Sequence, residues 1–567
     1  MRRRERPGYT IIAVLIVVSV LSLAAYRFAD AMTSEYAVAV RSSESAQSKT
    51  FAASGVHKAM GMLADPDTLN NQLAGNPYDN PQAFSNQSLT GFDQSRGGGR
   101  FSLITVGDTY NGSGESRYQQ RYGVSDESAK LNVNALIQLD PSGNVLHDAL
   151  MKLPNMTEDI ADAIVDWVDS DDTMRDAGAE TAYYAGLPQI YKAKNGPLSS
   201  LDELLLVKGV TPYLLFGNDR NRNGKLDPGE ADGNDYSRGW SEYLTVYGRE
   251  LDADANGNVR INLNPTDPAT DPVQYMADLT AVLGPEMANY IVYYKMNGAT
   301  TQLSTTPGST ATPATGMTAS PMAGSTTSPT TATTGAAATS QKAAAQALVV
   351  KVGSTNSATP AATTVVGTPE QLATAVQTMM ASGKMGTKKV TSFFTLMNTQ
   401  ATLPKAKDAP KDAPTVVVAC PLNDPAKLAE LLPKLLDMTT TRTGFEIAPR
   451  VNVNTAPPEV LLALPGLVQA DVDAIVAGRA NLTPTDPATT TGAWIVTQAG
   501  VKPETFRSLE KYVTGRTMTY RVQSVGYFGQ GGPVARVEAV IDTNQGHPRI
   551  LYFRDLTDLG RGFDLPR

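Results

Sequence analysis

The N-terminal part of the chain is dominated by one apolar run. Residues 9–26, YTIIAVLIVVSVLSLAAY, carry no charge and are just long enough to cross the hydrocarbon core of a bilayer. Alanines continue through a stretch with little glycine and no proline as far as Leu63. The pattern therefore predicts one helix over residues 9–65, about 55 residues and ~80 Å long.

Alternating apolar and polar positions predict strands in two distant parts of the chain. Near residues 101–133, GRFSLITVGD and YQQRYGVSDESAKLNV flank the glycine-containing turn TYNGSGES. Near residues 520–553, TMTYRVQSVGYF, PVARVEAVIDT and PRILYFRDL alternate over three more strands. We expect one antiparallel sheet, formed by residues 66–130 and 516–567 and interrupted by a long helical insertion. The predicted fold class is α+β.

The insertion contains a recurring unit. KLNVNALIQ…LMKLPNMTEDIADAIVDWVD (130–169) parallels RVNVNTAPPEVLLALPGLVQADVDAIVAGR (450–479), and RINLNPTDP…LTAVLGPEMANYIVYYK (260–295) is a weaker third copy. Each copy predicts a short strand and two helices whose apolar stripes pack together. We assign a helical domain with SAM-like or helix-hairpin-helix-like character to residues 131–298, and a second such region to residues 366–515.

Residues 299–365 differ in composition from both helical regions. Thr, Ala, Ser, Gly and Pro dominate, with few large apolar side chains, so this segment cannot form a core and is predicted to be a flexible linker. The following segment, 366–448, contains helix-like pieces such as PEQLATAVQTMMAS and DPAKLAELLPKLLDM. We interpret it as a helical expansion of the insertion.

Composition and charge exclude several classes of protein. A net charge of −8 over 567 residues disfavours a phosphate-binding surface as the main function. The single cysteine, Cys420, excludes an internal disulfide and a multi-thiolate metal site. The three histidines share no ligand spacing, and no nucleophile–base pair or phosphate loop is present, so we do not expect an enzyme.

The stretch DRNRNGKLDPGE, residues 219–230, is the sharpest chemical signal. It matches the twelve-residue calcium loop, in which oxygen ligands surround Ca²⁺, a glycine at position 6 makes the sharp turn, and an apolar residue (here Leu226) fills position 8. The flanking sequences do not read as EF-hand helices. The predicted Ca²⁺ ligands are Asp219, Asn221, Asn223, the Lys225 carbonyl, Asp227 and Glu230.

Two further acidic stretches give weaker signals. DADANGNV, residues 252–259, repeats the start of the calcium pattern but lacks a carboxylate at its twelfth position, and we interpret it as a turn. DWVDSDDTMRDAGAE, residues 166–180, either completes a second calcium site or forms a solvated acidic loop.

The N-terminus allows two interpretations. Arg2, Arg3, Arg4 and Arg6 keep the leader in the cytoplasm, so the body lies outside it. An ordinary signal peptide would be cut near ADA, residues 29–31. Against this, the basic leader ends in Gly8 directly before Tyr9, and helical composition runs through the supposed cleavage site.

A short basic leader, a glycine–aromatic junction and a long apolar helix resemble the type IV pilins and the type II secretion pseudopilins. The resemblance implies that residues 1–8 are a leader, cut between Gly8 and Tyr9 by a prepilin peptidase that methylates the new N-terminus. The fifth mature residue is Ala13, where the family normally has a glutamate that neutralises a neighbour's terminal amine. A chain without that glutamate resembles the K-type minor pseudopilin, which lies at the tip of the pseudopilus.

The interrupted sheet and the text of residues 160–210 also resemble the K type, although Thr181 stands where an acidic residue is frequent. The resemblance implies a non-enzymatic pseudopilus tip subunit that supports protein export. It also implies calcium in the helical domain and an inner-membrane anchor with a periplasmic body. The implied partners are the I- and J-type minor pseudopilins and other inner-membrane secretion components.

A second function stays open at this point. The turn LPGLV, residues 464–468, resembles the helix-hairpin-helix of DNA-binding proteins, as in a membrane-anchored competence receptor. Val468 replaces its second glycine and the first copy lacks glycine altogether, so we expect no nucleic acid as partner.

Overall fold

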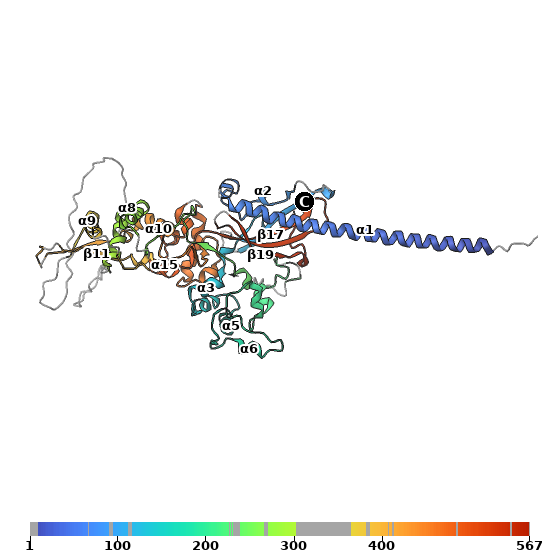
Figure 1. The fold of residues 1–567 in the computed structure, drawn as a ribbon, viewed down its shortest axis with the longest axis horizontal. Helices are drawn as coiled ribbons and strands as arrows, with labels where there is room; N and C mark the ends of the chain where they lie inside the picture. Colours follow the sequence, from blue (N-terminus) through green and yellow to red (C-terminus); the bar gives the residue numbers. More distant parts are fainter. Residues whose placement is uncertain are drawn as a thin grey trace, which may run out of the picture. The chain divides into compact units, whose positions relative to one another are not determined.

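The computed structural model (Figure 1) describes the chain with short gaps. The described residues are 9–65, 67–89, 95–110, 116–225, 227, 229–230, 239–265, 270–301, 364–381, 386–405, 408–410, 413–483, 486–544 and 547–565. They form two compact units, Met1–Arg260 together with Leu436–Arg567, and Ile261–Leu435. Gly8 and most of the predicted linker lie outside the described residues.

The predicted N-terminal helix is confirmed as α1, Tyr9–Ala64, 56 residues long. Its apolar side chains as far as Val38 are exposed, whereas buried residues begin at Ser48. Within the described part of the chain, α1 is the one helix long and apolar enough to cross a membrane. The same helix therefore combines a segment fit for lipid with a segment fit for a protein core.

The second half of α1 packs on the main sheet because small residues let the two backbones approach. The buried helix positions recur every three or four residues. A Cβ on Gly55 would lie 2.2 Å from the Ser524 Oγ, and one on Gly526 would lie 2.2 Å from the Ser48 carbonyl oxygen. Phe51 then packs edge-on against Phe528, with ring centroids 5.2 Å apart.

The main sheet is antiparallel and joins the two ends of the body, as predicted (Figure 1). Its order is β1-β2-β17-β18-β19, with β3 paired to β2 and β4 paired to β17. Tyr520 of β17 pairs with Asp126 of β4, so the insertion leaves and re-enters the sheet at adjacent positions. The strands are β1 Gln87–Ser88, β2 Gly99–Tyr110, β3 Ser116–Arg121, β4 Ser125–Asp126, β17 Thr519–Phe528, β18 Ala535–Asp542 and β19 Arg549–Asp555.

The insertion within the first unit is helical, as expected. Its helices are α3 Val133–Leu139, α4 Asn144–Leu150, α5 Glu158–Val168, α6 Thr181–Ala185, α7 Pro212–Phe216, α11 Pro458–Leu462, α12 Gln469–Gly478, α13 Pro487–Thr491, α14 Trp494–Thr497 and α15 Pro503–Leu509. Short α2, Pro81–Phe84, precedes the sheet.

Two of the sequence repeats close in the same way. In the first, β5 (Leu131–Asn132) pairs in parallel with β6 (Leu244–Thr245). In the second, β15 (Val451–Asn452) pairs in parallel with β16 (Val513–Thr514). Each repeat is therefore a small closed unit that starts at its Val-Asn motif. A further strand pair, β7 (Glu250–Leu251) with β14 (Glu446–Ile447), lies between them in the same unit.

The second unit departs from the sequence prediction. Helices form where expected, as α8 Pro272–Asn297, α9 Pro369–Met380 and α10 Pro425–Met438. The unit also has a four-stranded sheet of order β10-β12-β11-β9, which a purely helical expansion did not anticipate. Its strands are β9 Thr300–Thr301, β10 Thr364–Val366, β11 Thr399–Thr402 and β12 Thr415–Ala419. Its β-branched Thr and Val residues favour strand over helix, and the described ends of the predicted linker are strands.

Candidate metal centre

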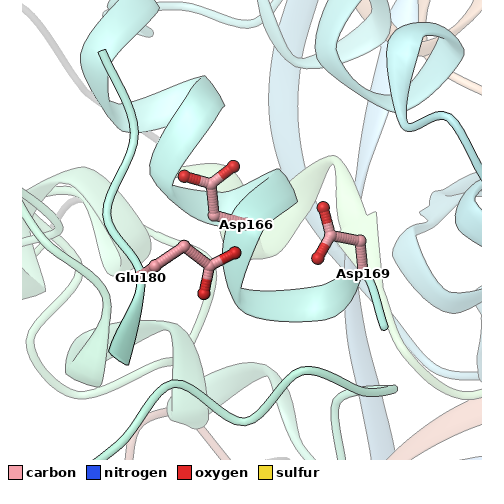
Figure 2. Close-up of side chains that lie close together, drawn as sticks. All are labelled: Asp166, Asp169 and Glu180. Carbon is pink, nitrogen blue, oxygen red and sulfur yellow. The ribbon is translucent and has the colours of Figure 1, made fainter. Parts of the chain in front are cut away.

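Three acidic side chains meet at the end of α5. Asp166 lies in the last turn of the helix, Asp169 is its C-cap residue, and Glu180 is the N-cap residue of α6. The chain turns back after Asp169, so the segment 170–179 returns Glu180 to the end of the helix that carries the two aspartates. Figure 2 shows the three carboxylates facing one another.

Several oxygens of these three carboxylates have no hydrogen-bond donor in the part of the chain that the structure describes. One oxygen of each lies within 4.8 Å of the others, the closest such acidic group among the described residues. Asp169 Oδ1 and both oxygens of Glu180 are buried and have no hydrogen-bond partner within the described chain. Because a buried carboxylate without a donor is costly, the arrangement fits a cation.

The pKa values of Asp169 and Glu180 are raised, because burial and the neighbouring carboxylates disfavour their charged forms. Burial, followed by repulsion from Asp171 and Asp166, raises the pKa of Asp169 to about 6. Burial, followed by Asp166, Asp169 and Asp172, raises the pKa of Glu180 to about 8. Negative charges held this close favour either a proton or a bound cation.

The returning segment is held by backbone hydrogen bonds. Asp166 accepts from the Arg175 and Ala179 amides, and Lys208 Nζ donates to the carbonyls of Ala177 and Gly178 at 3.0 and 3.1 Å. A Cβ on Gly178 would lie 1.9 Å from Asp166 Oδ2, so this position requires glycine. The acidic trio is therefore preorganised by its surroundings.

Asn195 adds an oxygen near the acidic segment. Its side-chain nitrogen donates to the Asp171 carbonyl, while its Oδ1 is buried and lacks a partner within the described residues. An amide oxygen left in this state suits a hard cation such as Ca²⁺.

A second candidate site is the loop Asp219–Glu230, which the sequence predicts to bind calcium. Asp219 and Glu230, its first and last ligand positions, are each 8% exposed. Asp219 accepts from the amides of Asn223 and Gly224 at 3.0 and 2.6 Å, and Glu230 accepts from those of Arg220, Asn221 and Asp227. The leading and closing carboxylates are therefore held by the loop's own backbone.

The centre of this loop is arranged differently from the acidic trio. Asn221 Nδ2 and Asn223 Nδ2 each donate to Asp227 Oδ2 at 2.7 Å. These uncharged amide groups satisfy Asp227 Oδ2 with hydrogen bonds but leave its negative charge in place. Burial, with Glu230 among the neighbours, raises the pKa of Asp219 to about 6, so the loop still fits a cation. Lys225 offers its carbonyl, and Leu226 lies outside the described residues.

The stretch 252–259 and the helix-hairpin-helix-like turn 464–468 behave as packing elements. Asp252 pairs with Arg260 at 2.9 Å and accepts from Thr440 Oγ1, which uses the carboxylate that a metal would need. The turn before α12 keeps Gly466 at φ 85°. Arg479, at the end of this hairpin, donates to the Val453 and Ala456 carbonyls rather than standing free for a phosphate.

A comparison with known families decides the resemblance for the first repeat. Residues 129–215 match the family described as "Type II secretion system (T2SS), protein K". This segment is therefore similar to protein K. It includes the acidic trio, so the predicted resemblance is confirmed for the part of the chain that carries the candidate metal centre.

Comparisons over larger parts of the chain give less. A solved structure, "The Crystal Structure of the GspK-GspI-GspJ complex from enterotoxigenic Escherichia coli Type 2 Secretion System", shares 11% identity with a TM-score of 0.35. It covers 91% of this chain and 97% of that one. A TM-score this low does not establish a common arrangement. No curated protein matches the chain.

The sequence singled out the calcium loop first and left the trio open. The twelve-residue loop could be recognised because its ligands have a fixed spacing in the sequence. Asp166 and Asn195 were not predicted as ligands, because the trio forms only when the chain reverses its direction. A usable signal was present in Gly178 of DAGAE, since glycine followed closely by glutamate marks the close approach to Asp166.

Proposed function

We propose that the chain is a K-type minor pseudopilin, a non-enzymatic subunit at the tip of a type II secretion pseudopilus that supports protein export. The observation that carries the proposal is the protein K match of residues 129–215, inserted in an antiparallel sheet that packs on a long N-terminal helix.

The N-terminal helix supports a place at the tip. After cleavage between Gly8 and Tyr9, Ala13 is the fifth residue and offers no carboxylate to the terminal amine of a neighbour above it. An unpaired charge in a low-dielectric environment is expensive, so a subunit above would be disfavoured. The basic leader and the apolar half of α1 support an inner-membrane anchor with the body in the periplasm.

The partners follow from the same reasoning. The solved complex named above contains GspK together with GspI and GspJ. We propose that the I- and J-type minor pseudopilins join this chain through α1, and that a prepilin peptidase and other inner-membrane secretion components act with it.

We propose Ca²⁺ as the cofactor of the helical domain. Asp166, Asp169 and Glu180, with the oxygen of Asn195, would hold one ion, and the loop Asp219–Glu230 a second. Bound Ca²⁺ supplies positive charge and oxygen coordination. The chain itself holds the acidic segment in place through Arg175, Lys208 and Gly178.

Site-specific labelling on purified pseudopili tests the tip proposal. A label on the exposed Asp148 is expected at filament ends only, together with co-purified I- and J-type subunits. An Ala13→Glu variant addresses the electrostatic argument, with Ala39→Glu on the same helix as the control for an added charge. Labels spaced evenly along the filaments would contradict the tip proposal.

A further inference from the structure

The loop Asp219–Glu230 carries its proposed ligand oxygens on one side and contacts other parts of the first unit on the other side. One side carries the ligand oxygens of Asp219, Asp227 and Glu230. The other side contacts strands of the main sheet and the C-terminal segment 556–565, here called the tail. The residues between Asn221 and Lys225 contribute to both sides.

Hydrogen bonds join the loop directly to the tail and the sheet. Asn223 Nδ2 donates to the Gly562 carbonyl at 2.6 Å. Arg536 of β18 donates to the Asn221 carbonyl, and Gln523 of β17 donates to the Arg222 carbonyl at 3.0 Å. In these bonds the loop contributes two of its backbone carbonyls and the side chain of Asn223, which is a proposed ligand.

The fit is also close in steric terms. A Cβ on Gly224 would lie 3.0 Å from Val106 of β2. A Cβ on Gly562 would lie 1.9 Å from the Nη1 of Arg536 and 3.3 Å from the Cβ of Asn223. Lys225 Nζ donates to Gln120 Oε1 at 2.6 Å, and Gln120 donates to the Asp564 carbonyl at 3.2 Å. The loop and tail can fit together in this way only when both backbones are fixed.

We infer that the loop Asp219–Glu230 is a calcium-dependent clasp, in which an ion bound on its inner side fixes the C-terminal tail and the insertion-facing side of the sheet. This inference rests on the calcium binding proposed above. Thermodynamic linkage makes the effect reciprocal, so tail docking must strengthen calcium binding by the same factor.

Asn223 separates the two roles, because it alone of the ligand side chains donates to the tail. Asn223→Asp keeps a side-chain oxygen for the ion but removes the N–H that bonds to Gly562. Asn221→Asp is the matched control: it makes the same change in charge two residues earlier, and its Nδ2 donates to Asp227.

The first experiment measures hydrogen exchange of the tail in the full chain in detergent, with calcium and with chelator. We expect calcium to slow exchange in residues 556–565 by about 5–150-fold, the usual range of coupling between two sites. Asn221→Asp should retain this slowing and Asn223→Asp should lose most of it. Equal behaviour of the two variants would overturn the clasp.

The second experiment measures the reverse direction by calorimetric titration with calcium, in an Asp169→Asn background that removes the other site. Gly562→Ala should weaken binding at the loop by the factor by which calcium slows tail exchange. Gly560→Ala is the control, because it also has positive φ but has no atom within 4 Å of an added Cβ. Its binding should stay closer to that of the parent.

The outcomes distinguish the clasp from the calcium proposal. If Glu230→Gln removes no equivalent of bound calcium, both are overturned. If the loop binds calcium but tail exchange is the same with chelator, the clasp alone is overturned.

Discussion

The first and second repeats of the insertion share a frame but use the end of its second helix differently. DAIVDW in α5 corresponds to DAIVAG in α12, so that Asp166 aligns with Ala477 and Asp169 with Ala480. In the first repeat the chain returns over the helix end and brings Glu180 to the aspartates. In the second, Gly478 stands where the first repeat has Trp167, and a Cβ on Gly478 would lie 2.8 Å from the ring of Trp494.

The difference shows that the frame itself carries no chemistry. Both repeats begin at a Val-Asn strand and close with a parallel strand pair. The acidic trio depends on two aspartates at the end of the helix and on the segment that follows it. The shared strand frame of the two repeats is therefore not sufficient to form the trio.

Consecutive acidic residues tie the two repeats to the main sheet. Asp126 accepts from Asn452 and Thr455 of the second repeat at 2.8 and 2.5 Å. Glu127 accepts from Thr245 of the first repeat at 2.5 Å and pairs with Arg521 of β17 at 2.6 Å. Substitutions can therefore test the two repeats separately, either where each one is attached to the main sheet or within the repeat itself.

The largest effect is expected from Glu127→Gln. Removing the carboxylate takes the closer of two acidic partners from the partly buried Arg521 and leaves Glu538 at 3.1 Å, so the free energy of unfolding should fall by up to about 3–5 kcal/mol. Urea unfolding at neutral pH measures this change. Glu446→Gln, which breaks a largely exposed pair with Arg249, should cost about 0–1 kcal/mol and is the control.

The same variant has a pH signature. Burial raises the pKa of Glu127, but the charges of Arg521 and Lys130 and the hydrogen bonds from Arg521 and Thr245 together outweigh it, so the pKa falls to about 2. Since this value lies below that of the unfolded chain, the pair stabilises the fold above about pH 4.5 and this stability is lost as pH falls toward 2. Glu127→Gln should remove that part of the pH dependence, and an unchanged profile would contradict the assignment.

The second effect is the response to calcium. Binding to the folded state alone should stabilise it by about 2.7 kcal/mol at a hundredfold excess over the dissociation constant of each site. Glu180→Gln should abolish the calcium-dependent stabilisation that comes from the first repeat, because it removes a carboxylate that has no hydrogen-bond donor within the described residues. Without calcium the variant should be no less stable than the parent, since the charge it removes is disfavoured there.

Adding acids to the second repeat sharpens this test. Ala477→Asp with Ala480→Asp restores the two aspartates but no counterpart of Glu180, so we expect no new calcium response in thermal unfolding. A gain comparable with that of the first repeat would show that the returning segment is unnecessary.

The smallest effect is expected from a pair of glycine variants. Gly178→Ala places a Cβ against Asp166 Oδ2 and should reduce the calcium response, at a cost of about 1–3 kcal/mol. Gly478→Ala overpacks Trp494 at a similar or smaller cost, because alanine also favours the helix. Its calcium response should be that of the parent. Gly186→Ala, with its nearest neighbour at 3.4 Å, is the control for both.

Much of the first unit could be predicted from the sequence because its signals are periodic. The apolar run gave α1 to within a residue, and two-residue alternation gave β2, β17, β18 and β19. The repeats were recognisable because each begins with the same Val-Asn strand. These features depend on local pattern, which a sequence displays directly.

The features that could not be predicted depend on contacts between residues that are far apart in the sequence. The strands of the second unit are two to five residues long, so alternation could not reveal them. Asp166 meets Glu180 through a chain reversal, and Asn195 comes from further along the chain. The calcium loop was found because its ligands are contiguous, yet its contacts with Gly562 and Arg536 carry no sequence signature.

The pairing of β4 with β17 has a consequence for synthesis. Asp126 and Thr517, which bond at that junction, are 391 residues apart. At about 5–20 residues per second, a ribosome needs roughly 20–80 s to make the intervening chain. During that time α1 and β2 have no β17 or β18 to cover them. The core-facing part of α1 therefore stays without its sheet partners for longer than most small domains take to fold.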